Sequence, residues 1–337
     1  MRDKEDPGVP AATTTLADVA REAQVGESTV SRVLRNHGSF APATRERVQE
    51  AALRLGYVPN RVAGTLASRG SNLVGIIIPS LANIVFPDLL RGANSTLEAA
   101  GFQSVIGVTD YDQDREEILI ASVLTWRPTG LLVVGLEHTE RARAMLRGSG
   151  IRIAELLDTD DEGIDLVVGY SNREAGRVTA NHLLSRGYRR IGYVGHDLEH
   201  DRRANKRHAG FVDALAAANV ALLDEEIIGT ASSIEVGRDG LERILARSPT
   251  LDAVYFSNDD MAIGGYFFCL TRGIAIPNRL ALFGFNGLDV ARLAPQPLST
   301  IRTPRVQIGE TAARLLLSGE PRTTVNLDFE LIEGATA

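Results

Sequence analysis

Two hydrophobic patterns divide the chain. Between residues 15 and 56, apolar residues recur every three or four positions, as they do on one face of a helix. From residue 72 onward, short apolar runs alternate with amphipathic stretches, and the first run is LVGIIIPS at residues 73–80. Such runs are typical of parallel strands that are buried on both faces. Their alternation with helices is typical of doubly wound sheets. The pattern predicts a small helical unit followed by an α/β unit.

The first unit should contain three short helices, at residues 16–23, from residue 27, and at residues 42–55. Thr15 is a suitable N-cap for the first helix, and Pro42 suits the first position of the third. Gly56 is the expected C-terminal stop. Two short helices joined by a turn of about three to four residues form a helix-turn-helix, whose second helix lies in the DNA major groove. The pattern therefore favours a DNA-reading head.

The segments on either side of these helices lack a stable pattern of their own. Residues 1–14 mix charge, Pro and Gly without periodicity and should form a disordered arm. Residues 57–71, YVPNRVAGTLASRGS, contain a helical segment that is short and interrupted by Gly64. Because isolated helices below about 12–15 residues are marginal, we expect this hinge to order only against a partner or DNA.

The α/β pattern is too long for one compact sheet. About ten strands alternate with helices, so two similar halves fit the length better. The last segments are a short stretch at 298–303, a helix at 305–318 and a strand at 324–332, which together make one more partial set.

Composition and charge indicate the compartment of the protein and the kind of partner it binds. One cysteine, Cys269, excludes an internal disulfide, and the polar N-terminus does not resemble a secretory signal. No apolar run approaches the roughly 20 residues that span a bilayer, so we expect a cytoplasmic protein. The net charge is −7, yet residues 15–70 contain eight Arg and five acidic residues. This asymmetry suits a nucleic-acid-binding module on an acidic body, although chance fluctuation is the alternative.

Several motifs together resemble the lactose-repressor (LacI) family of transcriptional regulators, from Thr15 over essentially the whole chain. They are TLADVAREAQVGESTVSRVLRN, YVPNRVAGTLA, VGYSNREAGR, RHAGF, YFSNDDMAIG and LFGFNG. The segments ANIVFPDLLRG and AELLD are most similar to the gluconate-operon repressor branch. The resemblance implies an all-α helix-turn-helix DNA-binding head plus a hinge helix. An α/β periplasmic-binding-protein-like core of two doubly wound parallel-sheet subdomains would follow, with the effector in the cleft between them.

The resemblance also implies domain boundaries. They are a disordered arm at 1–14, the head at 15–56, the hinge at 57–71, and an effector-binding and dimerisation domain at 72–337. Within the last, the N-subdomain would comprise about 72–170 and 301–320, and the C-subdomain about 171–300 and 321–337. The tetrameric members carry a C-terminal leucine heptad helix, whereas this chain ends LIEGATA, so a homodimer on near-palindromic operator DNA is expected.

Ten residues match DNA-contacting positions of the family: Thr15, Glu27, Ser28, Thr29, Ser31 and Arg32 in the head, and Asn60, Arg61, Ala63 and Leu66 in the hinge. Bidentate arginine to guanine is the commonest specific base contact, which suits Arg32, although a phosphate contact or a solvated arginine is the alternative. Glu27 either helps to reject wrong operators or only stabilises its helix N-terminus. Leu66 would wedge into the minor groove.

Eight residues match the effector cleft: Ser80, Asn83, Phe86, Asp158, Arg207, Asn258, Asp259 and Asn286. The guanidinium of Arg207 suits a carboxylate or vicinal hydroxyls, although a surface arginine is the alternative. Asn286 stands where many family members have an acidic residue. An amide carries no negative charge to repel an anionic ligand and adds a hydrogen-bond donor. Together they favour a sugar acid such as gluconate over a neutral hexose.

Two other classes of protein could share an α/β pattern of this kind. A transport-type sugar-binding protein predicts a signal peptide and no reading head. An enzyme on a doubly wound fold predicts a G-x-G-x-x-G motif, a Walker loop or a nucleophile elbow, and the sequence contains none of them. The histidines lack metal-ligand spacing. We therefore expect a non-catalytic regulator, most often a repressor in this family, with a sugar-type effector and without cofactor, metal or membrane partner.

Overall fold

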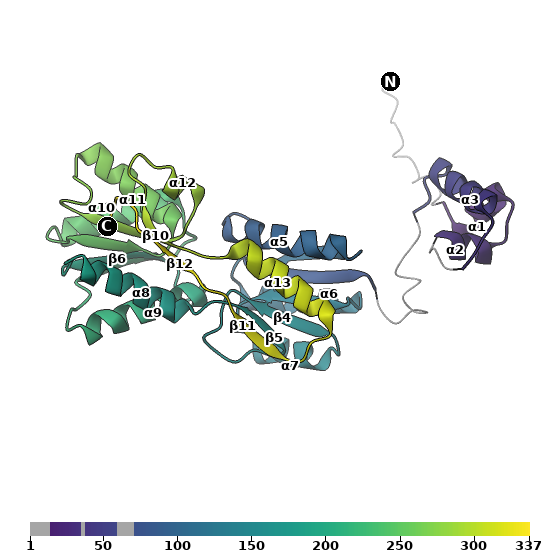
Figure 1. Ribbon diagram of the computed structural model, residues 1–337, viewed down its shortest axis with the longest axis horizontal. Helices are drawn as coiled ribbons and strands as arrows, with labels where there is room; N and C mark the ends of the chain where they lie inside the picture. Colours follow the sequence, from purple (N-terminus) through teal and green to yellow (C-terminus); the bar gives the residue numbers. More distant parts are fainter. Residues whose placement is uncertain (1–13, 35–37, 59–70) are drawn as a thin grey trace, which may run out of the picture. The chain divides into compact units, whose positions relative to one another are not determined.

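The computed structural model describes residues 14–34, 38–58 and 71–337 (Figure 1). They form two compact units, Met1–Ser71 and Asn72–Ala337, each of which is described by itself. Residues 1–13 of the expected arm at 1–14 and residues 59–70 of the expected hinge at 57–71 lie outside the described residues. The latter include four expected DNA contacts, Asn60, Arg61, Ala63 and Leu66. Among the described residues, no helix has the length and apolar character needed to cross a membrane.

The first unit contains the three predicted helices, α1 (Leu16–Ala23), α2 (Glu27–Leu34) and α3 (Pro42–Arg54). Thr15 caps α1 through a reciprocal arrangement with Asp18, whose carboxylate accepts the Thr15 backbone N–H at 2.9 Å. Val19, Val30 and Val48, one from each helix, are fully buried together. Each helix therefore contributes an apolar face to one small core.

The turn between α1 and α2 is strained at Gln24. Gln24 adopts the left-handed conformation with φ 55° and ψ 45°, a region that costs a residue with a Cβ roughly 1–2 kcal/mol. Ala41 precedes α3 without a side-chain cap, and Gly56 follows it with φ 62°. The head thus lacks two common sources of helix stability.

Gln24→Gly should stabilise the head by up to about 1 kcal/mol, because glycine adopts this conformation without steric cost. Gln49→Gly is the matched control, since Gln49 is exposed within α3 and glycine there should destabilise the head by about 1 kcal/mol. Amide hydrogen exchange of the α1–α3 amides in the full chain measures both changes. Equal effects of the two substitutions would contradict the assigned turn.

The second unit contains two six-stranded sheets, one in each subdomain. The first has the order β11-β5-β4-β3-β1-β2 and contains β1 (Leu73–Ile78), β2 (Gln103–Val108), β3 (Gly130–Val134), β4 (Arg152–Leu156), β5 (Leu166–Gly169) and β11 (Thr323–Asn326). The second has the order β12-β10-β9-β8-β6-β7 and contains β6 (Ile191–His196), β7 (Asp224–Ile228), β8 (Ala253–Phe256), β9 (Ala281–Asn286), β10 (Ser299–Arg302) and β12 (Glu330–Ile332). Neighbouring strands are parallel, except that β12 runs antiparallel to β10.

Helices pack beside both sheets (Figure 1). Those of the N-subdomain are α5 (Val85–Ala99), α6 (Gln113–Thr125), α7 (Glu140–Gly148) and α13 (Arg305–Ser318). Those of the C-subdomain are α8 (Asn172–Ser185), α9 (Arg202–Ala217), α10 (Ile234–Arg247), α11 (Asp259–Arg272) and the short α12 (Asp289–Arg292). Alternate residues of β1 explain the layers, because Ile76 packs in the core shared with α5 and α13, and Ile77 in the core shared with α6 and α7.

The last crossing between subdomains differs from the expectation. A change of subdomain was expected near Glu320, followed by one strand at 324–332. Instead, β11 pairs with β5 in the first sheet, and β12 pairs with β10 in the second. Between them, the ring of Phe329 lies 6.2 Å from that of Tyr170, at the first crossing. The sequence of such a short edge strand does not show which strand it pairs with. The hydrophobic pattern alone therefore could not assign β11 to the first sheet.

Close backbone contact fixes α9 against α8. A Cβ at Gly210 would lie 2.1 Å from the carbonyl oxygen of Arg173, and one at Gly176 would lie 1.9 Å from that of Arg207. Both distances are far below contact, so each helix needs its glycine. The same reciprocal arrangement joins α5 to α13 and α10 to α11, through Gly92, Gly309, Gly237 and Gly264. The position of Arg207 is therefore set by the packing of two helices.

Candidate DNA-reading head and effector cleft

The exposed face of α2 presents predicted DNA contacts. Glu27, Ser28 and Arg32 are exposed, Thr29 and Ser31 are half-buried, and Thr15 is exposed at the start of α1. The opposite face of α2 buries Val30 and Val33 in the core of the head. A helix with this division can rest on α1 and α3 while its polar side chains reach base edges.

Arg32 is held in place by packing. Its guanidinium lies 5.2 Å from the centre of the Phe40 ring, an arrangement that attracts a cation to the ring face. A Cβ at Gly38 would lie 2.6 Å from its Nη2. Among the described residues, no carboxylate lies within 4.0 Å of Arg32. Its donors can therefore face an anionic or acceptor surface.

The second unit has a cavity of about 660 Å³ between its subdomains. Its lining comes from loops after β1, β2, β6 and β7 and from the start of α11: Ser80, Ala82, Asn83, Asp110, Tyr111, Asp112, Gln113, Asp114, His196, Asp197, Glu199, His200, Asp201, Arg202, Ala231, Ser232 and Asp260. Ligands of open parallel sheets bind at this carboxyl edge, and the volume suits a small molecule.

Two of the eight predicted effector residues, Ser80 and Asn83, line this cavity. Each also shapes its own loop, because the Ser80 hydroxyl accepts the backbone N–H of Ala82 at 3.1 Å and Asn83 accepts that of Val85 at 3.1 Å. The other six predicted residues are not among those that line it.

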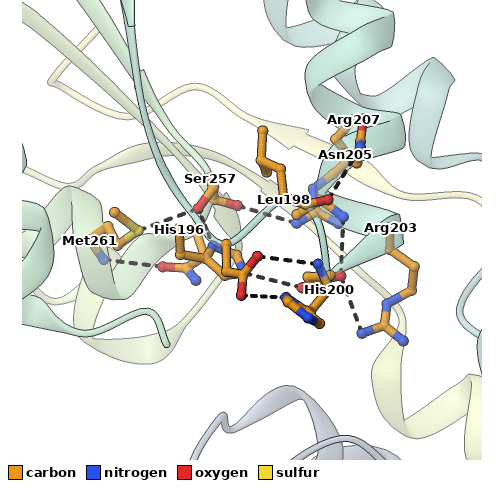
Figure 2. A network of polar contacts seen from close by, with 12 residues as sticks. His196, Leu198, His200, Arg203, Asn205, Arg207, Ser257 and Met261 are labelled. Carbon is orange, nitrogen blue, oxygen red and sulfur yellow. Dashed lines mark hydrogen bonds and ion pairs between the residues drawn. The ribbon is translucent and has the colours of Figure 1, made fainter. Parts of the chain in front are cut away.

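Arg207 is buried and makes its hydrogen bonds to neutral groups (Figure 2). It donates from Nη1 to the Asn172 side chain at 3.0 Å and, over 3.4 Å, from Nη2 to the Ser257 carbonyl. Its Nε has no partner among the described residues, none of which places a carboxylate within 4.0 Å of the guanidinium. The guanidinium lies 4.0 Å from the centre of the Phe285 ring. The protein therefore orients this arginine without placing a carboxylate in direct contact with it.

The predicted residues at the β8 and β9 ends hold the fold together. Asn258 caps α11 by accepting the Met261 N–H at 3.1 Å. Asp259 accepts from the Thr300 hydroxyl and from the Leu288 N–H, each at 2.7 Å. Burial raises the pKa of Asp259 to about 6 despite these hydrogen bonds. Asn286 is buried with φ 115°. Their effector contacts stay predictions.

Four buried polar residues of the cleft were absent from the expected set: His196, Asp201, Arg203 and Lys206. His196 lies 2.7 Å from the Ser257 hydroxyl and 3.2 Å from the carboxylate of Asp201. Burial opposes ionisation of Asp201, but the charge of Arg203, the hydrogen bond with His196 and the charge of Arg207 hold its pKa well below its usual range. The sequence signal was the charged run DRRANKR, which also fits a solvated helix face.

Arg203 and Lys206 both reach across the cleft from α9. The guanidinium of Arg203 lies 5.5 Å from the centre of the Phe86 ring on α5, and 3.5 Å from the carboxylate of Asp201. Lys206 contacts Asp158, the predicted effector residue after β4, at 2.5 Å. Burial raises the pKa of Asp158, and the bond from Lys206 offsets this only in part.

A buried charged cluster lies in the N-subdomain. His138 contacts Glu116 through Nδ1 at 2.6 Å, and its Nε2 is 3.3 Å from Glu155. Burial alone would lower the pKa of His138, but the hydrogen bonds and charges of Glu116 and Glu155 outweigh it and raise the pKa to about 9. His138 is therefore a cation at neutral pH, which offsets part of the cost of burying two carboxylates.

This cluster predicts a pH dependence of stability. Because the pKa of His138 rises from 6.5 to about 9 on folding, its contribution is complete below pH 6.5 and is lost as the pH rises through 9. His138→Gln should lower the free energy of unfolding by about 1–3 kcal/mol at pH 6.5, and by less at pH 10. Urea unfolding of both proteins across this range measures the difference. A difference that stayed constant with pH would contradict the assignment.

Residues 15–60 match the family model for bacterial regulatory proteins of the lacI family, and residues 180–336 match a periplasmic binding protein-like domain. The HTH-type transcriptional regulator GntR of Pseudomonas aeruginosa is 40% identical over 305 residues, or 90% of this chain and 88% of that protein. A LacI-family regulator from Silicibacter pomeroyi is 44% identical, with TM-score 0.92 over 96% of this chain and 99% of that one.

The lac repressor dimer bound to operator and the anti-inducer ONPF has TM-score 0.80 over 96% of this chain and 99% of that one. At 23% identity this likeness concerns the fold alone. The same family is indicated by the helix-turn-helix head, by the two parallel sheets and by the 40% sequence identity to GntR. The chain belongs to the LacI family of DNA-binding transcriptional regulators.

Proposed function

We propose that this regulator represses a carbohydrate-utilisation operon and responds to gluconate or a related sugar acid. As a homodimer, it would place two α2 helices in the half-sites of a near-palindromic operator. The lac repressor, which has the same fold, binds its operator as a dimer and supports this arrangement. The similarity to GntR supports the assignment to the gluconate-operon branch.

One observation carries the choice of a sugar acid. Arg207 is a buried cation with an unpartnered Nε and without a carboxylate within 4.0 Å among the described residues. An unpaired buried charge is costly, so a bound carboxylate would compensate it with charge-assisted hydrogen bonds. The amide at Asn286 adds no negative charge nearby. Carboxylates of the cavity wall, such as Asp112 and Asp197, could accept hydrogen bonds from the hydroxyls of the same ligand.

Calorimetry with the full chain tests the ligand class. Gluconate should bind, and galactose and ribose should bind at least tenfold more weakly, because neither supplies an anion to Arg207. Asn286→Asp should weaken gluconate binding by placing a carboxylate near the bound one. Binding of galactose or ribose without binding of any aldonic acid would overturn the proposal.

A solute-binding protein without a DNA role is the alternative. The folded head argues against it, because α2 presents polar side chains that such a protein does not need. Selection of DNA from a random-sequence library separates the two. A regulator enriches one near-palindromic site, whereas a solute-binding protein enriches none.

A further inference from the structure

Lys206 makes an unusual number of charged contacts. Its Nζ lies 2.5 Å from a carboxylate oxygen of Glu137, 2.5 Å from one of Asp158 and 2.7 Å from one of Asp161. The lysine is buried, with 9% of its surface exposed, and Asp158 is fully buried. Burial would lower the pKa of Lys206, but the bonds to Asp158, Asp161 and Glu137 raise it above its usual value. Lys206 is therefore charged whenever the protein is folded.

The three carboxylates belong to the other subdomain. Lys206 is on α9, which packs on α8 beside the second sheet. Glu137 follows β3, and Asp158 and Asp161 follow β4, all in the first sheet. One side chain thus joins two strand ends of one subdomain to the helix of the other that carries Arg207.

Charge balance makes this contact sensitive to removal of the lysine. One cation faces three carboxylates, and all three are within hydrogen-bond reach of the same nitrogen. Without it, the carboxylates would repel one another, most strongly at buried Asp158, where solvent screens charge least. Separation of the two subdomains would relieve this repulsion by admitting water.

We propose that Lys206 is a positioning residue of the effector switch, which links the subdomains in a closed arrangement with Arg207 beneath the cavity. It orders the cleft before the effector arrives and so lowers the cost of closure on binding. The expected effector contact Asp158 thereby acts through Lys206, as an anchor for α9. The proposal builds on the proposed function, yet the link itself is tested without any effector.

The test measures the separation of the subdomains in the effector-free full chain. Spin labels are attached at Ser122 on α6 and at Glu242 on α10, which are both exposed. The distance between the two labels is measured in protein in which Cys269 is replaced by Ala. Wild-type protein should give mainly the short distance, and Lys206→Met should shift most of the population to longer distances. Lys206→Arg should restore the short one, because arginine keeps the charge.

Arg247→Met is the matched control. Arg247 also contacts two carboxylates, Asp224 and Glu226, but all three residues belong to the C-subdomain. It should leave the distance distribution unchanged. Identical distributions for wild type and Lys206→Met would overturn the proposal, and so would a shift that Lys206→Arg shares. If the link holds but calorimetry finds no aldonic acid that binds, the ligand assignment fails and the linking role stands.

Discussion

Arg207→Met should abolish the response to a sugar acid in the full-length protein. The substitution removes the buried cation that the effector carboxylate would pair with, while methionine can fill the space against Phe285. Loss of one partner of a buried, hydrogen-bonded charge pair costs about 2–5 kcal/mol, or ~30- to 5,000-fold in gluconate affinity. Calorimetry at fixed pH and salt measures the loss.

The same substitution should leave the effector-free protein as stable as before, or more stable. No described residue places a carboxylate within 4.0 Å of Arg207, so its removal relieves a desolvation cost that outweighs its longer-range attraction to Asp201. Arg177→Met, which removes an exposed arginine paired with Glu174 on α8, is the control for both measurements. Gluconate affinity within twofold of wild type in Arg207→Met would place the effector elsewhere.

Arg32→Met should weaken binding to the preferred operator by about 1–3 kcal/mol per half-site, the range of a good bidentate base contact. The guanidinium is exposed on α2 and oriented by Phe40. If Arg32 reads a base, repeated selection of DNA with the variant should show relaxed preference at one position of each half-site. If it contacts a phosphate, affinity should fall for all sequences and the salt dependence should decrease.

Arg54→Met provides the control for the head. Arg54 is exposed at the end of α3 and paired with Glu22 at 2.7 Å, so its replacement removes one charge without touching α2. Its affinity should stay close to wild type. Unaltered affinity and base preference in Arg32→Met would show that this arginine does not contact DNA.

Most of the fold follows from local sequence because periodic segments are long. The helices α1 (Leu16–Ala23) and α13 (Arg305–Ser318) have the bounds expected from their amphipathic stretches. In contrast, β11 and β12 were expected as one strand, and four-residue α12 was not foreseen. Short edge elements bury little apolar surface of their own, so tertiary contacts decide where they pair.

The site was predicted less completely than the fold. Arg207 stands in a motif, and its guanidinium chemistry pointed to an anion. Lys206 is one residue away, but its partners Glu137 and Asp158 come from loops some 50 to 70 positions earlier in the chain. A charged run on a helix usually indicates a solvated face. In the structure, Asp201, Arg203, Lys206 and Arg207 of this run are buried, which no local pattern could indicate.

Binding of the effector in the cleft should change the affinity of the head for DNA, and one titration measures this coupling. DNA selected by the full chain is labelled, and its anisotropy is followed with saturating gluconate, saturating galactose or neither. Gluconate should change the DNA dissociation constant at least about fivefold, and bound DNA should change gluconate affinity by the same factor. Galactose should change neither. An unchanged DNA dissociation constant with gluconate bound to the cleft would contradict the account.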